Sequence, residues 1–164
     1  MTSLQRLLAS CVTLALAGCT GIPSTPTQYG VEAGLRPLRS GVTGKITAID
    51  KGDGVSVLVS IANMAQGNYR IALHETGNCS SPNGFAAGPL YPPGSDPRRS
   101  APILQANPES STTSTVHVSG VKTADLMGRS VLVYDGTRLP EVQPGVPNNV
   151  IACGVFSAVV PLDF

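Results

Sequence analysis

The chain has 164 residues, and its 11 basic side chains nearly balance its 10 acidic ones. Only 13% of the residues are charged, which argues against a nucleic-acid partner, because proteins of that class carry a basic stripe. Tryptophan is absent, while glycine and proline number 18 and 14. This composition favours an all-β domain with many turns and a core of Val, Ile, Leu and Ala.

The N-terminal segment has the pattern of a lipoprotein signal peptide. Arg6 supplies a positive charge, residues 7–17 are mostly apolar, and residues 16–19 read Leu-Ala-Gly-Cys, which resembles the bacterial lipobox. The apolar stretch is too short for a transmembrane helix, which needs about 20 residues. We therefore predict cleavage after residue 18 and lipid attachment to Cys19. The alternative is an ordinary secretory signal with a chance cysteine.

Lipid on Cys19 would anchor the mature chain to a membrane, outside the cytoplasm. Lipoproteins of this type carry several acyl chains, and more than one chain is needed for stable anchoring. In Gram-negative bacteria an Asp after the lipidated cysteine commonly marks retention in the inner membrane. Thr20 occupies that position here. In such a host we expect a place in the cell envelope, on the periplasmic face of the outer membrane.

Two cysteines remain for the mature domain. Cys11 leaves with the signal peptide and Cys19 takes the lipid, so that Cys79 and Cys153 are left. An exported chain meets an oxidising compartment, which favours a disulfide between these two residues. Two unpaired buried thiols are the alternative.

We divide the chain into a signal peptide (1–18), a lipidated flexible tether (19–40) and one domain (41–164). The tether is rich in Pro, Gly, Ser and Thr and shows no hydrophobic period, as is typical of linkers. An ordered first strand near residues 28–31 is the alternative for part of this segment.

Alternation of apolar and polar residues predicts strands in the domain. It is clearest at residues 55–61, after the turn signal Lys-Gly-Asp-Gly at residues 51–54. The predicted strands are residues 42–49, 55–61, 69–74, 101–106, 113–118, 129–134 and 150–160, with a short helical turn at 123–127. Short strands joined by turns predict a sandwich or barrel. The long loop at residues 76–100 is a candidate functional segment.

Four segments of this domain carry motifs that occur together in one known family. Residues 74–79 read His-Glu-Thr-Gly-Asn-Cys, and residues 86–93 read Ala-Ala-Gly-Pro-Leu-Tyr-Pro-Pro. Residues 128–134 read Gly-Arg-Ser-Val-Leu-Val-Tyr, and residues 152–155 read Ala-Cys-Gly-Val. In order and spacing they resemble the Cu/Zn superoxide dismutases, including both cysteines of the family disulfide. The resemblance implies an all-β, eight-stranded Greek-key barrel or sandwich of that type.

The resemblance also implies where copper would bind. The family strand that ends in His-x-His-Glu supplies two copper ligands, and here residues 72–75 read Ala-Leu-His-Glu. His74 is therefore kept as a vestigial ligand position, while Ala72 replaces its partner. The position of the last copper histidine is occupied by Tyr134.

The remaining positions that the resemblance marks are lost as well. Leu90 stands where the family has the histidine that bridges copper and zinc. The loop that would bind zinc contains Asp96 but no histidine. Val150 stands where the family has the arginine that attracts superoxide.

These losses bear on the chemistry. Dismutation in this family needs one-electron cycling of a bound metal, which ordinary side chains do not supply. Copper or zinc needs about three or four ligands in a fixed geometry, and the whole chain has 2 histidines. The second, His117, is expected to face solvent, because Val116 and Val118 point to the other side of its strand. We expect no catalytic residue, no metal site and no cofactor.

The sequence therefore favours a non-catalytic module, not an enzyme. We expect a lipid-anchored envelope protein whose degenerate superoxide dismutase-like domain binds another envelope protein or has a structural role. One alternative is a dismutase with weak metal-dependent activity. Another is copper delivery, although Met64 and Met127 are isolated in the sequence. Asp-Pro-Arg-Arg at residues 96–99 is either a partner-binding patch or a solvated loop.

Overall fold

The computed structural model describes residues 30–92, 101–107, 111–137 and 148–159. The strands are β1 (Gly30–Pro37), β2 (Thr43–Lys51), β3 (Gly54–Ala62), β4 (Gly67–His74), β5 (Ile103–Ala106), β6 (Thr112–Ser119), β7 (Ser130–Asp135) and β8 (Val150–Ala158). The helical elements are the 3₁₀ turn η1 (Phe85–Ala87) and the short helix α2 (Thr123–Leu126). Within these ranges, no helix has the length and apolar character needed to cross a membrane.

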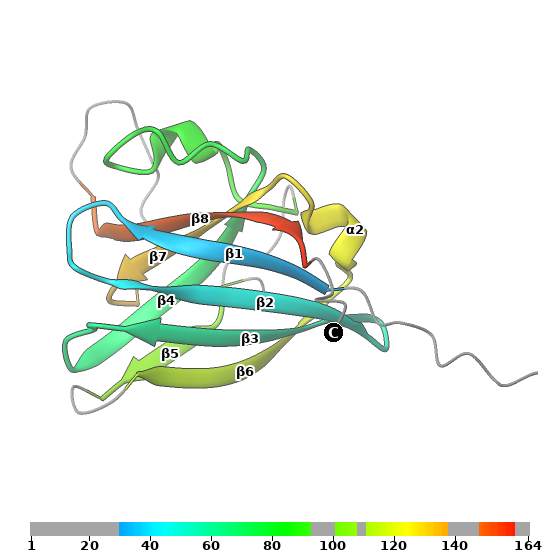
Figure 1. Ribbon diagram of the computed structural model, residues 1–164, viewed down its shortest axis with the longest axis horizontal. Coiled ribbons are helices and arrows are strands. Elements are labelled where there is room, and N and C mark those ends of the chain that lie inside the picture. The colour runs from blue at the N-terminus through cyan, green and yellow to red at the C-terminus, as the bar shows by residue number, and fades with distance from the viewer. Residues whose placement is uncertain (1–29, 93–100, 108–110, 138–147, 160–164) are drawn as a thin grey trace, which may run out of the picture.

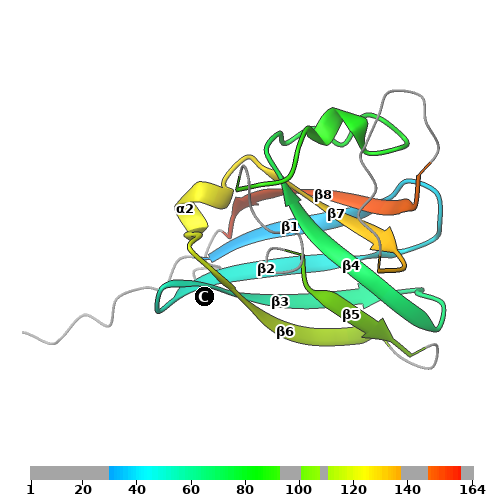
Figure 2. The same cartoon turned by 180° about the vertical axis from the view of Figure 1, so that it is seen from behind.

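The strands form one antiparallel 8-stranded sheet in the order β5-β4-β7-β8-β1-β2-β3-β6. The two end strands, β5 and β6, approach each other, so the sheet curls into a nearly closed barrel (Figure 1). Figure 2 shows the same barrel from behind, with β4 running beside β7 and the loop that follows β4 standing above the sheet. The predicted all-β class is confirmed.

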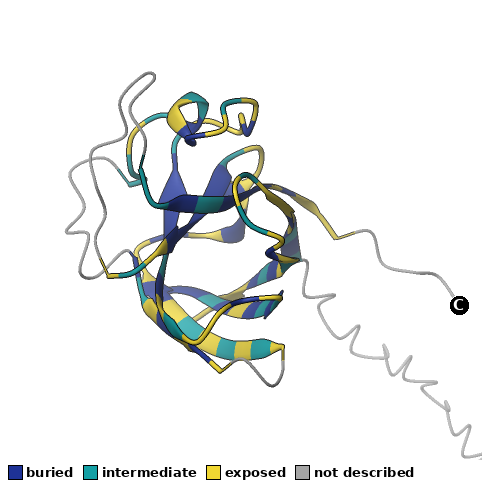
Figure 3. Ribbon diagram, turned by 90° about the vertical axis from the view of Figure 1, so that its left-hand side faces the viewer, coloured by how far each residue is buried: buried dark blue, intermediate teal, exposed yellow. Residues whose placement is uncertain are grey.

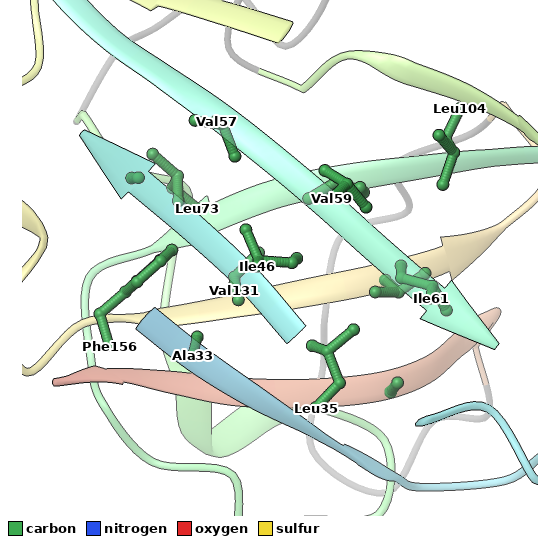
Figure 4. Packing of buried hydrophobic residues seen from close by; sticks show 14 of the residues in the cluster. Ala33, Leu35, Ile46, Val57, Val59, Ile61, Leu73, Leu104, Val131 and Phe156 are labelled. Carbon is green, nitrogen blue, oxygen red and sulfur yellow. The ribbon is translucent and has the colours of Figure 1, made fainter. Parts of the chain in front are cut away.

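Alternate residues of the strands fill the inside of the barrel. In β3, Val55, Val57, Val59 and Ile61 are buried, whereas Leu58 on the other face is exposed. Figure 3 shows the resulting stripes of buried and exposed residues. Figure 4 shows how apolar side chains from many strands, among them Ile46, Leu73 and Phe156, meet inside the barrel and form its inner core. Burial of these side chains supplies the main driving force for folding.

Strand β1 corrects the predicted boundary of the tether. Residues 30–37 of the predicted tether (19–40) lie in the sheet, paired with β2 on one side and β8 on the other. Val31, Ala33 and Leu35 point into the inner core. The alternation was hidden because glycine occupies two of the outward positions and alanine contributes little to a hydrophobic period. The described domain therefore begins before residue 41.

The other strands lie where the alternation predicts them, with ends that differ by a few residues. In the predicted β2–β3 hairpin, Lys51 pairs with Gly54, and Gly52 in the turn has a φ of 60°. Glycine suits this position because it adopts positive φ without steric cost. The predicted helical turn at residues 123–127 is α2.

Candidate functional site

A second apolar cluster covers the outside of the barrel over β4, β7 and β8. Because side chains alternate along a strand, Ala72 of β4 and Leu132 of β7 point away from the inner core, to which their neighbours belong. We call this group the outer cluster. Its buried members are Ala72, Cys79, Ala87, Ala101, Leu132, Tyr134, Val150 and Cys153, and Leu38 and Leu90 pack against them.

His74, the last residue of β4, lies at the outer cluster with only 2% of its surface exposed. Its Nδ1 is 2.7 Å from the carbonyl oxygen of Gly88, and its Nε2 is 2.8 Å from the hydroxyl oxygen of Tyr134. A carbonyl only accepts hydrogen bonds, so Nδ1 carries the hydrogen. Nε2 of the neutral ring then accepts the hydrogen of the Tyr134 hydroxyl. Both ring nitrogens are used.

Burial keeps both partners of this hydrogen bond neutral. It lowers the pKa of His74, and this effect exceeds the opposing effect of the hydrogen bonds to Gly88 and Pro89. Burial also raises the pKa of Tyr134 well above its ordinary value. A charged form of either ring would lose its hydration without gaining a counter-charge. At neutral pH the pair is an imidazole and a phenol, held by one hydrogen bond.

The chain segment after η1 closes over His74. Leu90 forms an isolated antiparallel bridge with His74. On either side of this bridge, the backbone N–H of Glu75 donates to Pro89, and that of Tyr91 donates to Leu73. This pairing continues the sheet along the end of β4, beyond the residues that pair with β5. It also fixes the Gly88 carbonyl opposite the histidine ring.

The positions singled out by the family resemblance meet at this one place. Ala72, Tyr134 and Val150 are fully buried members of the outer cluster, and Leu90 packs against it. His74 is joined to Tyr134 by the hydrogen bond described above. These residues come from β4, β7, β8 and the loop after η1. Asp96, like the predicted patch at residues 96–99, lies outside the described residues.

The residues at this site do not fit copper or zinc. Both metals need several nitrogen, sulfur or carboxylate ligands, and the ligand atoms must be free to coordinate. Here His74 uses both nitrogens in hydrogen bonds, and Ala72, Leu90 and Val150 offer no ligand atom. In the described part of the chain, no three residues of the types His, Cys, Asp and Glu form a group that could hold a metal.

The predicted disulfide between Cys79 and Cys153 is confirmed. Their Cα atoms are 5.7 Å apart, within the usual range, and the bond joins residues separated by 74 positions. It ties the loop after β4 to β8 within the outer cluster. In the chain-entropy model, closing a loop of this length stabilises the fold by about 4–5 kcal/mol.

The other histidine has a partner that the sequence did not reveal. The side chain of His117 is 43% exposed, in line with its predicted outward position, and its Nε2 lies 3.0 Å from Oδ1 of Asp53. This hydrogen bond lowers the pKa of Asp53. The pair lines an open hollow of about 350 Å³, together with Lys51, Ser56 and Thr115. The register that places Gly54 opposite Ser119 brings these distant residues together.

The chain matches no protein-family model and no curated protein. Cys19 and Thr20, on which the predicted lipid anchor depends, lie outside the described residues.

Proposed function

We propose that this chain is a lipid-anchored protein of the bacterial envelope, on the periplasmic face of the outer membrane in a Gram-negative host. Its barrel is a degenerate, metal-free relative of the Cu/Zn superoxide dismutases that acts as a non-catalytic binding or structural module. The lipobox pattern before Cys19 supports the anchor. The connections between the strands and the meeting of the motif positions at the outer cluster support the relationship to the family.

The connections of the barrel support a Greek-key topology. β6 lies beside β3, and β7 lies beside β4, so the connections from β3 to β4 and from β6 to β7 each pass over other strands. A strand that returns beside the first of three consecutive strands defines the Greek key. Fold alone carries no function, however, and other families share sandwich architectures.

The observation that carries the proposal is the convergence of the aligned positions at the outer cluster. Ala72, Leu90 and Tyr134 lie around His74 although their motifs are separate in the chain, and this supports the relationship. The same convergence argues against the enzyme. Where the family has ligands, this chain has apolar side chains and a phenol that caps the remaining histidine.

The charge of the site also differs from that of the enzymes. An anionic substrate needs a positive charge at the mouth of the site. The aligned position holds Val150, which is fully buried against the loop. The position that would attract superoxide therefore carries no positive charge.

The first test is reconstitution of the lipidated protein in detergent with copper and zinc. We expect no stoichiometric metal, superoxide decay at the rate of buffer, and the same melting temperature in the presence of a chelator. A metal-dependent rise in melting temperature, together with activity that His74→Ala abolishes, would instead establish a residual dismutase.

The second test rebuilds the lost site. A chain with Ala72→His, Leu90→His and Tyr134→His places three imidazoles around His74, and we expect it to bind copper. Adding His74→Ala to these substitutions is the matched control and should weaken that binding. If the rebuilt chain binds no copper although it folds, the proposed relationship to the family loses its main support.

A further inference from the structure

The loop after β4 presents an exposed aromatic ring from a stretch without charge. Residues 76–92 contain no Asp, Glu, Lys or Arg. Near the middle of this stretch, Phe85 begins η1 and is 43% exposed. Among the exposed large hydrophobic residues of the described chain, it is the one aromatic. In Figures 1 and 2 this short turn stands above the sheet, away from the body of the barrel.

The base of the loop is fixed to the barrel from several directions. The Cys79–Cys153 disulfide attaches its first part to β8. Asn148 donates a side-chain hydrogen bond of 2.7 Å to the carbonyl of Asn83. Gly84 is buried with a φ of 75°, and a Cβ there would lie 3.0 Å from a side-chain carbon of Leu132. The backbone of Gly84 thus rests directly on the outer cluster.

The tip of the loop is also ordered by its own hydrogen bonds. The N–H of Ala86 donates to the Ser81 hydroxyl at 2.8 Å, and the N–H of Phe85 donates to the side-chain oxygen of Asn83 at 3.2 Å. The turn buries Ala87 completely and directs Phe85 outward. The exposure of Phe85 follows from this rigid turn. A ring held in place in this way loses little conformational entropy on binding.

We propose that this loop, residues 76–92, is a docking surface for a protein partner that has an uncharged, apolar pocket for Phe85. The inference deepens the proposed function, because it names the surface through which a binding module of this kind would act. Interface centres are depleted in charged residues and enriched in aromatic ones, as this loop is. An anionic membrane surface or a nucleic acid would be attracted by basic side chains, and the loop has none.

The test starts in cells with the full lipidated protein and a photo-crosslinking phenylalanine analogue. The analogue is placed at Phe85 in one strain and at Leu58 in another, because Leu58 is equally exposed, at 44%, on the outer face of β3. We expect a discrete adduct with another protein from position 85 and none from position 58. Adducts only with lipid, adducts with a second copy of the chain, or equal adducts from both positions would overturn the inference.

The second step measures affinity for the crosslinked protein after its purification. Phe85→Ser should weaken binding by about thirtyfold or more, as expected for an interface hot spot, and Leu58→Ser by less than about threefold. Both variants should keep the melting temperature of the native chain. Unchanged affinity of Phe85→Ser would refute the docking surface. Metal content and superoxide decay of the native chain test the proposed function separately. A failure of the docking surface can therefore be told apart from a failure of the proposed function.

Discussion

The hydroxyl of Tyr134 is the hydrogen-bond donor to Nε2 of His74, inside a cluster of apolar side chains. Tyr134→Phe keeps the ring and removes the donor. It leaves a buried imidazole nitrogen unpaired, and we expect the free energy of unfolding to fall by about 1–3 kcal/mol in denaturant titration.

The matched control for this substitution is Tyr69→Phe. The hydroxyl of Tyr69 donates to the carbonyl of Ala65 at 2.9 Å, and Ala65 is exposed, so water can replace the lost donor. We expect a smaller loss, about 0.5–1 kcal/mol. Equal losses for the two variants would show that His74 does not depend on Tyr134.

The protonation of His74 links stability to pH. Burial lowers its pKa in the folded state below the ordinary value of 6.5, so below that pH the unfolded chain binds a proton that the folded chain does not. Stability is therefore complete above about pH 6.5 and falls as the pH decreases toward the folded-state pKa, with a slope of up to about 1.4 kcal/mol per pH unit.

Unfolding titrations between about pH 6.5 and pH 5 measure this slope, because the Asp residues with lowered pKa, Asp50 and Asp53, act at lower pH. His74→Gln should flatten the curve. If the slope persists in His74→Gln, another group causes it.

The residues that complete the outer cluster show what the sequence could and could not predict. The motif resemblance singled out Ala72, Leu90, Tyr134 and Val150, because a motif gives the place of each residue in the chain. It did not predict the Tyr134–His74 or Asp53–His117 hydrogen bonds. Those hydrogen bonds depend on strand register and on side-chain geometry. Their partners are separated by 60 and 64 positions in the chain, and a linear pattern does not encode contacts over such separations.

At the level of elements, the loop after β4 is held to the sheet through Gly84. Its φ of 75° and the nearby Leu132 side chain both disfavour a Cβ. Gly120 is a matched control, since it has a φ of 74° but no atom within 4 Å of an added Cβ. We expect Gly120→Ala to cost about 1–2 kcal/mol from backbone strain, and Gly84→Ala to cost more.

Thermal or denaturant unfolding measures the loss of stability in each glycine variant. The difference between the two losses is the part that comes from the packing of the loop on the outer cluster. The proposed docking surface depends on the same contact, so Gly84→Ala should also weaken partner binding. Equal stability losses at the two glycines would mean that the loop is not packed on the sheet as described.

A strand was easier to predict when its inward residues were clearly more hydrophobic than its outward residues. In β3, Val and Ile alternate with Ser56, Leu58 and Ser60, and its burial follows the same pattern. In β1 the outward Gly30 and Gly34 and the inward Ala33 give almost no contrast, so the strand was assigned to the tether. β1 is held in the sheet in part by its pairing with β8. The two strands are far apart in the sequence, so a local pattern does not predict this pairing.

At the scale of the whole molecule, the position of β1 limits how far the barrel can stand from the proposed lipid anchor. Gly30 is the first residue of the sheet, and Cys19 precedes it by 30 − 19 = 11 residues. A fully extended chain spans at most about 3.6 Å per residue, so this segment reaches no more than about 40 Å. If Cys19 is lipidated, Gly30, where the barrel begins, lies within about that distance of the membrane.

Cys19→Ala tests the anchor and leaves every described residue of the barrel unchanged. We expect the variant to lose its lipid and no longer to sediment normally with membranes, either as unprocessed precursor or as mis-sorted protein. Once purified, it should keep the disulfide and the melting temperature of the native chain, since every contact of the inner core and the outer cluster is retained. Mass spectrometry of the N-terminal peptide and membrane fractionation measure the two outcomes. Native protein without lipid on Cys19, or a variant that is processed and sediments as the native protein does, would show that the chain reaches its site by another route.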